Sequence, residues 1–315
     1  MTTTTATATL LPPQRRRHRY QHRMFVPALV MLGAFLFSSK GIFIKLLYAE
    51  GLGPSGALAL RMSIALPFYL IPVLLMGKKV LSIRPRDWSA MAALAFVGYF
   101  LSSLINFTGL QFISIGLERV ILFSYPTLVL LGASLFQNRR PSGSLFLASG
   151  LSWFGLFLVI KEEIQLSNDT SWVLLGCGMV LLSATIYAGY ILLAKPVIER
   201  IGASRYTSIS MCFSCLYILL HFAITDGNVA ALVDSQKVLI YGVVIGIFGT
   251  VAPTYILSYG LSKIPSTSYA VISSVGPVAT IGLSLVMLQQ TPGILQLIGI
   301  IISLTGSLMA GRCGK

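Results

Sequence analysis

The sequence is poor in charged residues, and acidic residues are the scarcest among them. Only 10% of its 315 residues are charged, and nine of them are Asp or Glu. It contains three histidines and four cysteines, and no GxSxG, HExxH, phosphate-loop or paired-carboxylate motif. Three of the cysteines lie inside apolar runs, which excludes a disulfide framework. These absences argue against an enzyme, a metal site and a cofactor.

Apolar residues, in contrast, are abundant. They make up 55% of the chain, and the mean hydropathy of +0.83 is typical of an integral membrane protein. The net charge of +14 does not indicate nucleic-acid binding, because the basic residues are dispersed between apolar runs. The partners we expect are membrane lipid and a small-molecule substrate.

Ten apolar windows of bilayer-crossing length predict ten transmembrane helices in an all-α bundle. The windows are 25–47, 54–76, 88–110, 113–137, 142–160, 172–194, 206–224, 238–261, 266–289 and 293–310. The loops between them are short, so successive helices should be mostly antiparallel neighbours.

The stretch 113–137 is half of an internal repeat. A shift of 151 positions places Pro126 on Pro277 and Gly98 on Gly249, with further glycines in register. Each copy contains five spans, and an odd number makes the second copy enter the bilayer from the opposite face. We therefore predict two inverted five-helix repeats. The predicted boundaries are a disordered basic tail 1–24, a first repeat 25–160, a linker 161–171, a second repeat 172–310 and a tail 311–315.

The distribution of Lys and Arg predicts the orientation. With the N-terminus in the cytoplasm, most of the 23 basic residues fall on the cytoplasmic side, and the opposite side holds only Lys161 and Lys237. This bias is the positive-inside pattern, so both termini should be cytoplasmic. We expect a multi-pass protein of the cytoplasmic (inner) membrane. An organellar membrane is the lesser alternative, because the Thr-rich and Arg-rich tail also resembles a transit peptide.

Four charged residues lie deep within the predicted spans, where each needs a partner or water. At 1.5 Å rise per residue, Lys40, Arg61 and Glu118 come to a similar level in the outer half of the bilayer, and Arg119 follows directly. Three interpretations remain open. The layer attracts an anionic substrate group, or Glu118 latches to Lys40 or Arg61 as an outer gate, or Glu118 belongs to a structural ion pair while Arg119 reaches outward.

The repeat favours a substrate or gating role for these charges. At the offset of 151, Tyr269 and Ala270 stand in the places of Glu118 and Arg119. Charges needed only for the fold would be expected in both copies. We therefore predict Lys40 as a substrate-binding cation, and Arg61 together with the Glu118 and Arg119 pair as gating or coupling residues.

Polar and aromatic residues at helical spacing are candidates for a cavity wall. The predicted substrate-binding residues besides Lys40 are Asn106, Tyr125, Tyr187, Tyr255 and Ser273. Pro126 and Pro277 each remove a backbone hydrogen bond in mid-span and are predicted hinges. Gly242 and Gly246 form a GxxxG step, which indicates close packing either inside the bundle or against a second copy.

The sequence resembles the EamA family of the drug/metabolite transporter superfamily. The resemblance rests on FLFSSKGIFIK in the first span, Arg61 in the second, and the run SIGLERVILFSYPTLVLLGASLF with its counterpart STSYAVISSVGPVATIGLSLV. It implies a ten-span carrier with a central cavity between inverted halves. Members usually carry a Glu at the end of the fourth and ninth spans, whereas Arg139 (or its neighbour Asn138) and Gln290 stand there in this chain. This departure speaks against carrying over a proton-coupling role from those carboxylates.

Together these observations predict a secondary transporter. We expect export of small organic metabolites, such as amino acids or related amphipathic and drug-like compounds, by alternating access. The alternative is an anion exchanger for phosphorylated metabolites or nucleotide sugars; a membrane-embedded enzyme or a scaffold is more distant. Proton coupling and a homodimer remain open.

Overall fold

The structure is a bundle of helices. The computed structural model describes residues 13–77, 80, 82–122, 124–136, 143–167, 169–273 and 293–313, with all their side chains except those of 13–24, 135, 136, 145 and 310–313. All regular elements in these residues are helical. In chain order they are α1 (Pro13–Ala49), α2 (Pro54–Leu75), α3 (Pro85–Leu94), the π-helix η2 (Ala95–Leu101), α4 (Ser102–Gly109), α5 (Ile115–Leu122), α6 (Tyr125–Phe136), α7 (Gly143–Leu166), α8 (Thr170–Ile201), α9 (Ala203–Thr225), the 3-10 helix η3 (Ala230–Leu232), α10 (Gln236–Val243), the π-helix η4 (Val244–Val251), α11 (Ala252–Lys263), α12 (Ser266–Ser273) and α14 (Ile294–Cys313).

Seven helical stretches in the described residues are long and apolar enough to cross a membrane. They are Phe25–Ala49, Pro54–Leu75, Pro85–Gly109, Ile115–Ser134, Thr170–Ile201, Ala203–Thr225 and Gln236–Lys263. Helices α7 and α14 occupy the places of the fifth and tenth predicted spans, and the apolar part of α14 is the shorter Ile294–Met309. The ninth predicted span begins with α12 and continues outside the described residues.

Helix α1 begins earlier than the sequence pattern predicted. It starts at Pro13, so residues 13–24 are helical where a disordered tail was expected. The physical reason is local: no Gly or Pro interrupts 14–26, and Arg has a high helix propensity. Pro is also well tolerated at the first position of a helix.

The junctions between helices follow ordinary capping chemistry. Pro54 and Pro85 stand at the starts of α2 and α3. The Asp169 side chain accepts a hydrogen bond of 2.9 Å from the Ser171 N–H and caps α8. Gly202, with φ of +96°, separates α8 from α9 in a conformation that side chains rarely adopt. These residues therefore fix where long apolar helices end.

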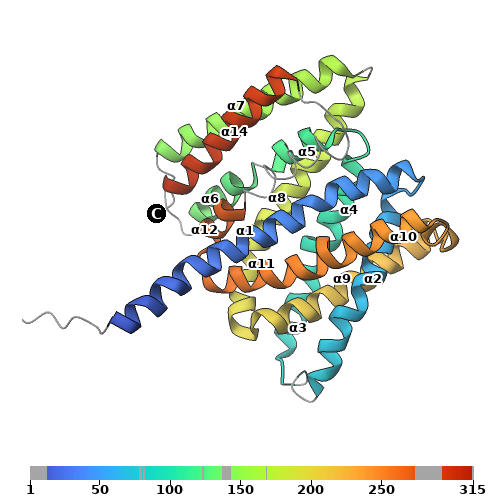
Figure 1. Cartoon of the computed structure of the whole chain (residues 1–315), viewed down its shortest axis with the longest axis vertical. Coiled ribbons are helices and arrows are strands. Elements are labelled where there is room, and N and C mark those ends of the chain that lie inside the picture. Colours follow the sequence, from blue (N-terminus) through green and yellow to red (C-terminus); the bar gives the residue numbers. More distant parts are fainter. Residues whose placement is uncertain are drawn as a thin grey trace, which may run out of the picture.

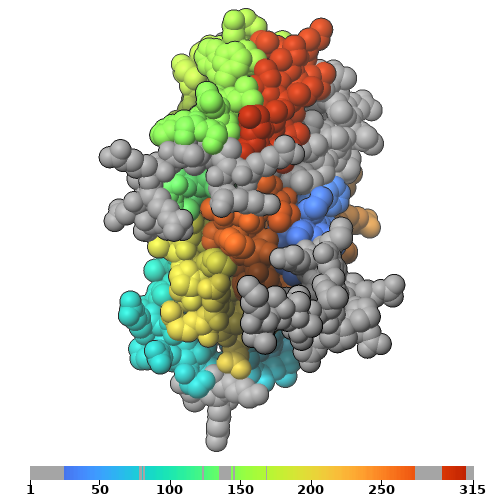
Figure 2. All heavy atoms as spheres, turned by 90° about the vertical axis from the view of Figure 1, so that its left-hand side faces the viewer, coloured from blue at the N-terminus to red at the C-terminus, as the bar shows by residue number. Residues whose placement is uncertain are grey.

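Helices α7 and α14 lie side by side along one edge of the molecule, in green and red in Figures 1 and 2. A Cβ atom added at Gly299 would lie 2.7 Å from the carbonyl oxygen of Gly155. One added at Gly306 would lie 2.7 Å from that of Ala148. Between them the hydroxyls of Ser152 and Ser303 approach to 3.3 Å. Small residues thus bring two backbones into contact, as in other membrane helix pairs.

The GxxxG step in the eighth predicted span packs inside the bundle. A Cβ atom at Gly242 would lie 2.8 Å from the Leu60 side chain, and one at Gly246 would lie 2.8 Å from Ile64. Both neighbours belong to α2. The GxxxG step therefore serves close packing inside the bundle, of α10 and η4 against α2.

Candidate functional site

Four charged side chains from three helices meet in the interior. Lys40 belongs to α1, Arg61 to α2, and Glu118 and Arg119 to α5; their exposed fractions are 7%, 2%, 0% and 1%. Arg119 packs against α1 at Gly41, next to Lys40, and η4 contacts both Lys40 and the Arg61 backbone. The structure thus brings together the residues that the sequence placed at one level.

Glu118 pairs with its sequence neighbour. Its Oε2 lies 2.7 Å from Nη2 of Arg119, and its Oε1 accepts a hydrogen bond of 3.2 Å from the Asn106 amide on α4. The predicted latch from Glu118 to Lys40 or Arg61 is therefore not formed in this conformation. The idea that Arg119 reaches outward is wrong, because that side chain is buried beside its partner.

Two glycines bring α1 close to these charges. A Cβ atom at Gly41 would collide with the guanidinium group of Arg119, so a side chain here would force Arg119 to move away from α1. On the opposite side, a Cβ atom at Gly249 of η4 would lie 3.1 Å from Cβ of Lys40. The π-helical turn at Gly249 therefore packs directly on the lysine. π-Helical turns inside helices frequently mark functional sites.

Two of the cations lie over aromatic rings. Nζ of Lys40 is 3.5 Å from the centre of the Phe37 ring, and Cζ of Arg61 is 5.0 Å from that of Phe107. Such contacts stabilise a cation by about 2 kcal/mol or more once it is removed from water. They do not satisfy every donor, since Nε of Arg61 and Nε of Arg119 have no hydrogen-bond partner within the described residues.

A cavity borders the charged cluster. Its volume is about 80 Å³, smaller than the roughly 300–1,000 Å³ of an open small-molecule site, so a ligand would need it to widen. Its lining residues are Ala34, Phe37, Ser38, Arg119, Leu122, Tyr125, Ala184, Tyr187, Leu257, Tyr269 and Ser273. A second, much smaller space of about 10 Å³ shares Phe37, Tyr187, Leu257 and Tyr269 with it and extends to Tyr99, Tyr190 and Ser258. The wall is largely aromatic and aliphatic, with one guanidinium group.

The aromatic rings of the wall contact one another. Phe37 is stacked on Tyr187 with 6.2 Å between ring centres, and Tyr125 lies 6.0 Å from Tyr187. The Tyr125 and Ser273 hydroxyls are hydrogen-bonded, linking α6 to α12. The Tyr190 hydroxyl donates to that of Tyr99 at 3.1 Å. These contacts hold the rings in defined orientations around the space.

The sequence predicted part of this wall. Tyr125, Tyr187 and Ser273 line the cavity as expected of candidate binding residues. Lys40 and Asn106 lie behind the wall, next to Phe37 and Glu118 respectively, and do not line either space. Tyr255 is also outside it and binds the Ser208 hydroxyl at 2.7 Å. Whether these residues contact a substrate remains a prediction.

Phe37 and Tyr269 are wall residues that the sequence analysis did not select. Phe37 carries no distinguishing pattern within an apolar span, although it lies three residues before Lys40 and hence on the same helix face. For Tyr269 a signal was available, because the repeat places it in the position of Glu118. Equivalent positions in the two halves thus supply a charge on one side and a ring on the other.

The fourth predicted span is broken just before Pro126. Helix α5 ends at Leu122 and α6 begins at Tyr125. Proline cannot donate the hydrogen bond to the Leu122 carbonyl that a continuous helix would need. The Ser124 N–H and hydroxyl both donate to the Ile121 carbonyl, at 3.0 and 2.6 Å. A discontinuity therefore occurs at the predicted hinge. Its counterpart Pro277 lies outside the described residues.

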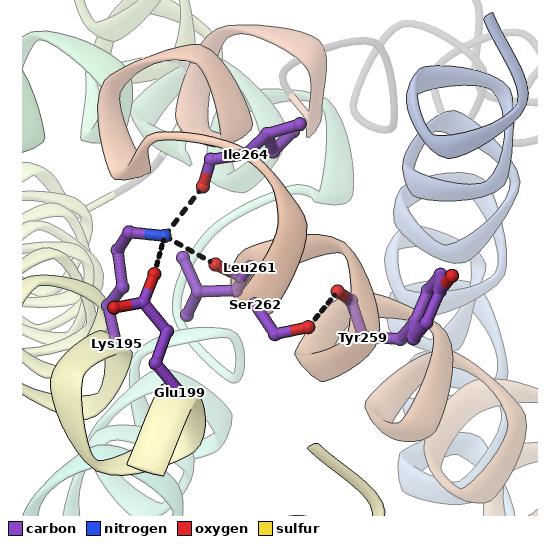
Figure 3. A network of polar contacts seen from close by, with 6 residues as sticks. All are labelled: Lys195, Glu199, Tyr259, Leu261, Ser262 and Ile264. Atoms are coloured by element: carbon purple, nitrogen blue, oxygen red, sulfur yellow. Dashed lines mark hydrogen bonds and ion pairs between the residues drawn. The ribbon is translucent and has the colours of Figure 1, made fainter. Parts of the chain in front are cut away.

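Lys195 connects two helices, α8 and α11 (Figure 3). Its Nζ donates to the carbonyl oxygens of Leu261 and Ile264, both at 2.8 Å, and pairs with Glu199 at 2.8 Å. These carbonyls belong to the C-terminal end of α11, where a cation is favourable. The contact ties α8 to α11 next to Leu261, which lines the smaller space.

Known proteins are similar to this chain in sequence and in fold. The model of the EamA-like transporter family matches twice, over residues 24–161 and 174–312. An uncharacterized transporter of Bacillus subtilis, YcbK, is 31% identical over 283 residues, which cover 86% of this chain and 87% of that protein. An uncharacterized transporter of Synechocystis is 25% identical over 300 residues, 86% of this chain and 88% of its own length.

A solved crystal structure shares the fold. It superposes with a TM-score of 0.69 at 15% identity, over 91% of this chain and 96% of the other. The family match spans most of the chain, and it agrees with the apolar helices and with the sequence resemblance. The protein is therefore a membrane transporter that belongs to the EamA-like transporter family.

Proposed function

We propose that this transporter exports small amphipathic organic metabolites, the class that includes amino acids and drug-like compounds, by alternating access. The observation that carries the proposal is that both halves of the chain line one cavity. Phe37, Arg119 and Tyr125 come from the first half, and Tyr187 and Tyr269 from the second. Relative movement of the halves would therefore reshape the space and change its access.

The proposed architecture is ten spans in two inverted repeats. It is supported by the twofold family match and by a Methanocaldococcus jannaschii protein of which 90% matches only 41% of this chain, at 28% identity. It is also supported by the contacts of α7 with α14. Ser152 and Ser303 are 151 positions apart and meet each other, as two equivalent residues on a twofold axis would.

The proposed orientation places both termini in the cytoplasm, in the inner membrane of a bacterial cell. Single cysteines at Arg84 or Arg205, in a chain without its own cysteines, should react with a membrane-impermeant maleimide only after the cells are opened. A cysteine at Lys237 should react in intact cells, because this exposed residue lies on the predicted outer side. Labelling of positions 84 and 205 from opposite sides of the membrane would contradict the inverted architecture.

Polar ties at both ends of the bundle are candidates for the contacts that change during transport. On the proposed cytoplasmic side, Lys195 holds the end of α11 and Arg200 pairs with Asp87 at 2.5 Å. On the outer side, Glu163 accepts hydrogen bonds of 2.7 Å from the Ser114 N–H and hydroxyl at the start of α5. Breaking one set while the other holds would open the cavity to one compartment.

The excess of buried cations favours a second candidate, exchange of phosphorylated metabolites or nucleotide sugars. The cavity wall argues for the first candidate, because its rings and aliphatic groups suit an apolar body better than a strongly hydrated one. Proton coupling and a homodimer remain predictions. Of the proposed coupling residues, Glu118 is the buried carboxylate.

A solute screen tests the proposed function. Purified full-length protein in proteoliposomes should show saturable counterflow of an amphipathic organic solute, and sugar phosphates should compete poorly. Repeating the assay with an imposed pH gradient tests coupling to protons. Exclusive exchange of phosphorylated compounds would favour the second candidate, and absence of any solute movement would contradict both.

A further inference from the structure

We infer that the cavity takes an organic monoanion with an aromatic or apolar body and no free ammonium group. The inference rests on the proposed function and narrows its substrate class. It follows from the juxtaposition of a guanidinium group with unpartnered nitrogen and a wall of aromatic rings, in a region that lacks a free carboxylate.

The charge balance of the interior is the first step. Three cations, Lys40, Arg61 and Arg119, share the region with the single carboxylate of Glu118. The other eight acidic residues lie at or near helix ends: Glu50, Asp87, Glu162, Glu163, Asp169, Glu199, Asp226 and Asp234. Uncompensated like charges are costly where water is excluded, so an anion entering the cavity lowers this cost.

Glu118 is not available to a substrate. It is fully buried, with one oxygen facing Arg119 at 2.7 Å and the other accepting from Asn106 at 3.2 Å. A substrate ammonium group would therefore have to displace Arg119 or remain unpaired beside three cations. A substrate carboxylate, in contrast, meets the Arg119 group that lines the cavity and whose Nε has no partner in the described structure.

Aromatic faces also attract cations, which is the main argument for an ammonium ligand. In this cavity the face of Phe37 is already beside Lys40, whose Nζ lies 3.5 Å from the ring centre. Tyr187 is stacked against Phe37, so a cation placed there would be repelled by the lysine. The rings are thus better suited to the uncharged body of a ligand.

The same wall favours a ligand with one negative charge over a ligand with two. Arg119 is the cation that reaches the larger cavity, whereas Arg61 is directed at Phe107 and Lys40 at Phe37. The remaining lining is aliphatic, aromatic or hydroxyl-bearing. A phosphate dianion would lose its hydration there without enough donors to replace it.

Three compounds with the same ring and similar chain length test the inference: 3-phenylpropanoate, L-phenylalanine and 2-phenylethylamine. Each is titrated against the purified full-length protein, with competition for binding and counterflow in proteoliposomes as readouts. We expect 3-phenylpropanoate to bind roughly tenfold or more tightly than L-phenylalanine, and the amine not to saturate, because an ammonium group stays unpaired in this site.

Tighter binding of L-phenylalanine or of the amine overturns the inference, and so does failure of all three compounds to bind. Transport of another solute in the screen would still uphold the proposed function, so the two failures are distinguishable. In a second test, Arg119→Gln should abolish the preference for the acid, while Lys161→Gln, on the exposed surface of α7, should retain it. Retention of the full preference by Arg119→Gln would also overturn the inference.

Discussion

Replacement of Lys40 by alanine should abolish transport while leaving folded protein in the membrane. The ammonium group lies beside Phe37 in the cavity wall and within the field of Arg61 and Arg119. The contact of a cation removed from water with an aromatic ring is worth about 2 kcal/mol or more. Counterflow into proteoliposomes should therefore fall by roughly 30-fold or more. Stability should not suffer equally, because the change removes one cation from a cluster with excess positive charge.

Two further variants separate charge from packing at this position. Lys40→Met keeps most of the side-chain volume and should be as inactive as Lys40→Ala. Lys161→Ala removes the same charge from the exposed surface of α7 and should transport normally. Size-exclusion profiles in detergent verify folding. Normal transport by Lys40→Ala would remove this residue from the site.

Replacement of Glu118 by alanine should destabilise the protein strongly. The carboxylate is fully buried and neutralises Arg119 at 2.7 Å. Removing one member of a buried pair leaves an uncompensated charge and typically costs about 3–5 kcal/mol. The midpoint of thermal unfolding in detergent should fall clearly below that of the unmodified chain. An unchanged midpoint would show that the pair does not stabilise the fold.

The double variant Glu118→Gln with Arg119→Met distinguishes a structural pair from a functional one. Both charges disappear together, so most of the lost stability should return. If the pair serves transport, as we propose, counterflow stays defective in this stable variant. Recovery of both stability and transport would assign the pair a structural role only.

Much of the charged layer was predictable from sequence, because the helical rise per residue is constant. Counting residues from the ends of apolar runs placed Lys40, Arg61 and Glu118 at one depth, and the structure brings these side chains together. The partner of Glu118 was not predictable in this way. Depth does not specify the rotation of a helix about its axis. That rotation directs Glu118 at Arg119 and Asn106, and not at Lys40 or Arg61.

The residues of the cavity wall were also only partly predictable from spacing along single helices. Helical spacing selected Tyr125 and Tyr187 correctly, but it selected Tyr255 as well, which binds Ser208 on α9. Spacing defines a face of one helix, and only neighbouring helices decide whether that face borders a space. Phe37 lines the cavity but was not predicted. In an apolar span, the sequence around an aromatic residue does not show whether the ring faces a cavity or lipid.

The sequence alone determined that this is a membrane protein with long helices, a repeated half, buried charges and a break at Pro126. Each of these depends on composition or on local backbone chemistry, which act within a single helix. Contacts between helices were decided by the tertiary structure: Gly41 against Arg119, Gly249 against Lys40, and Gly242 against Leu60. They depend on interhelical distances and rotations that arise only when all the helices pack together, and the first of them positions Arg119 in the cavity wall.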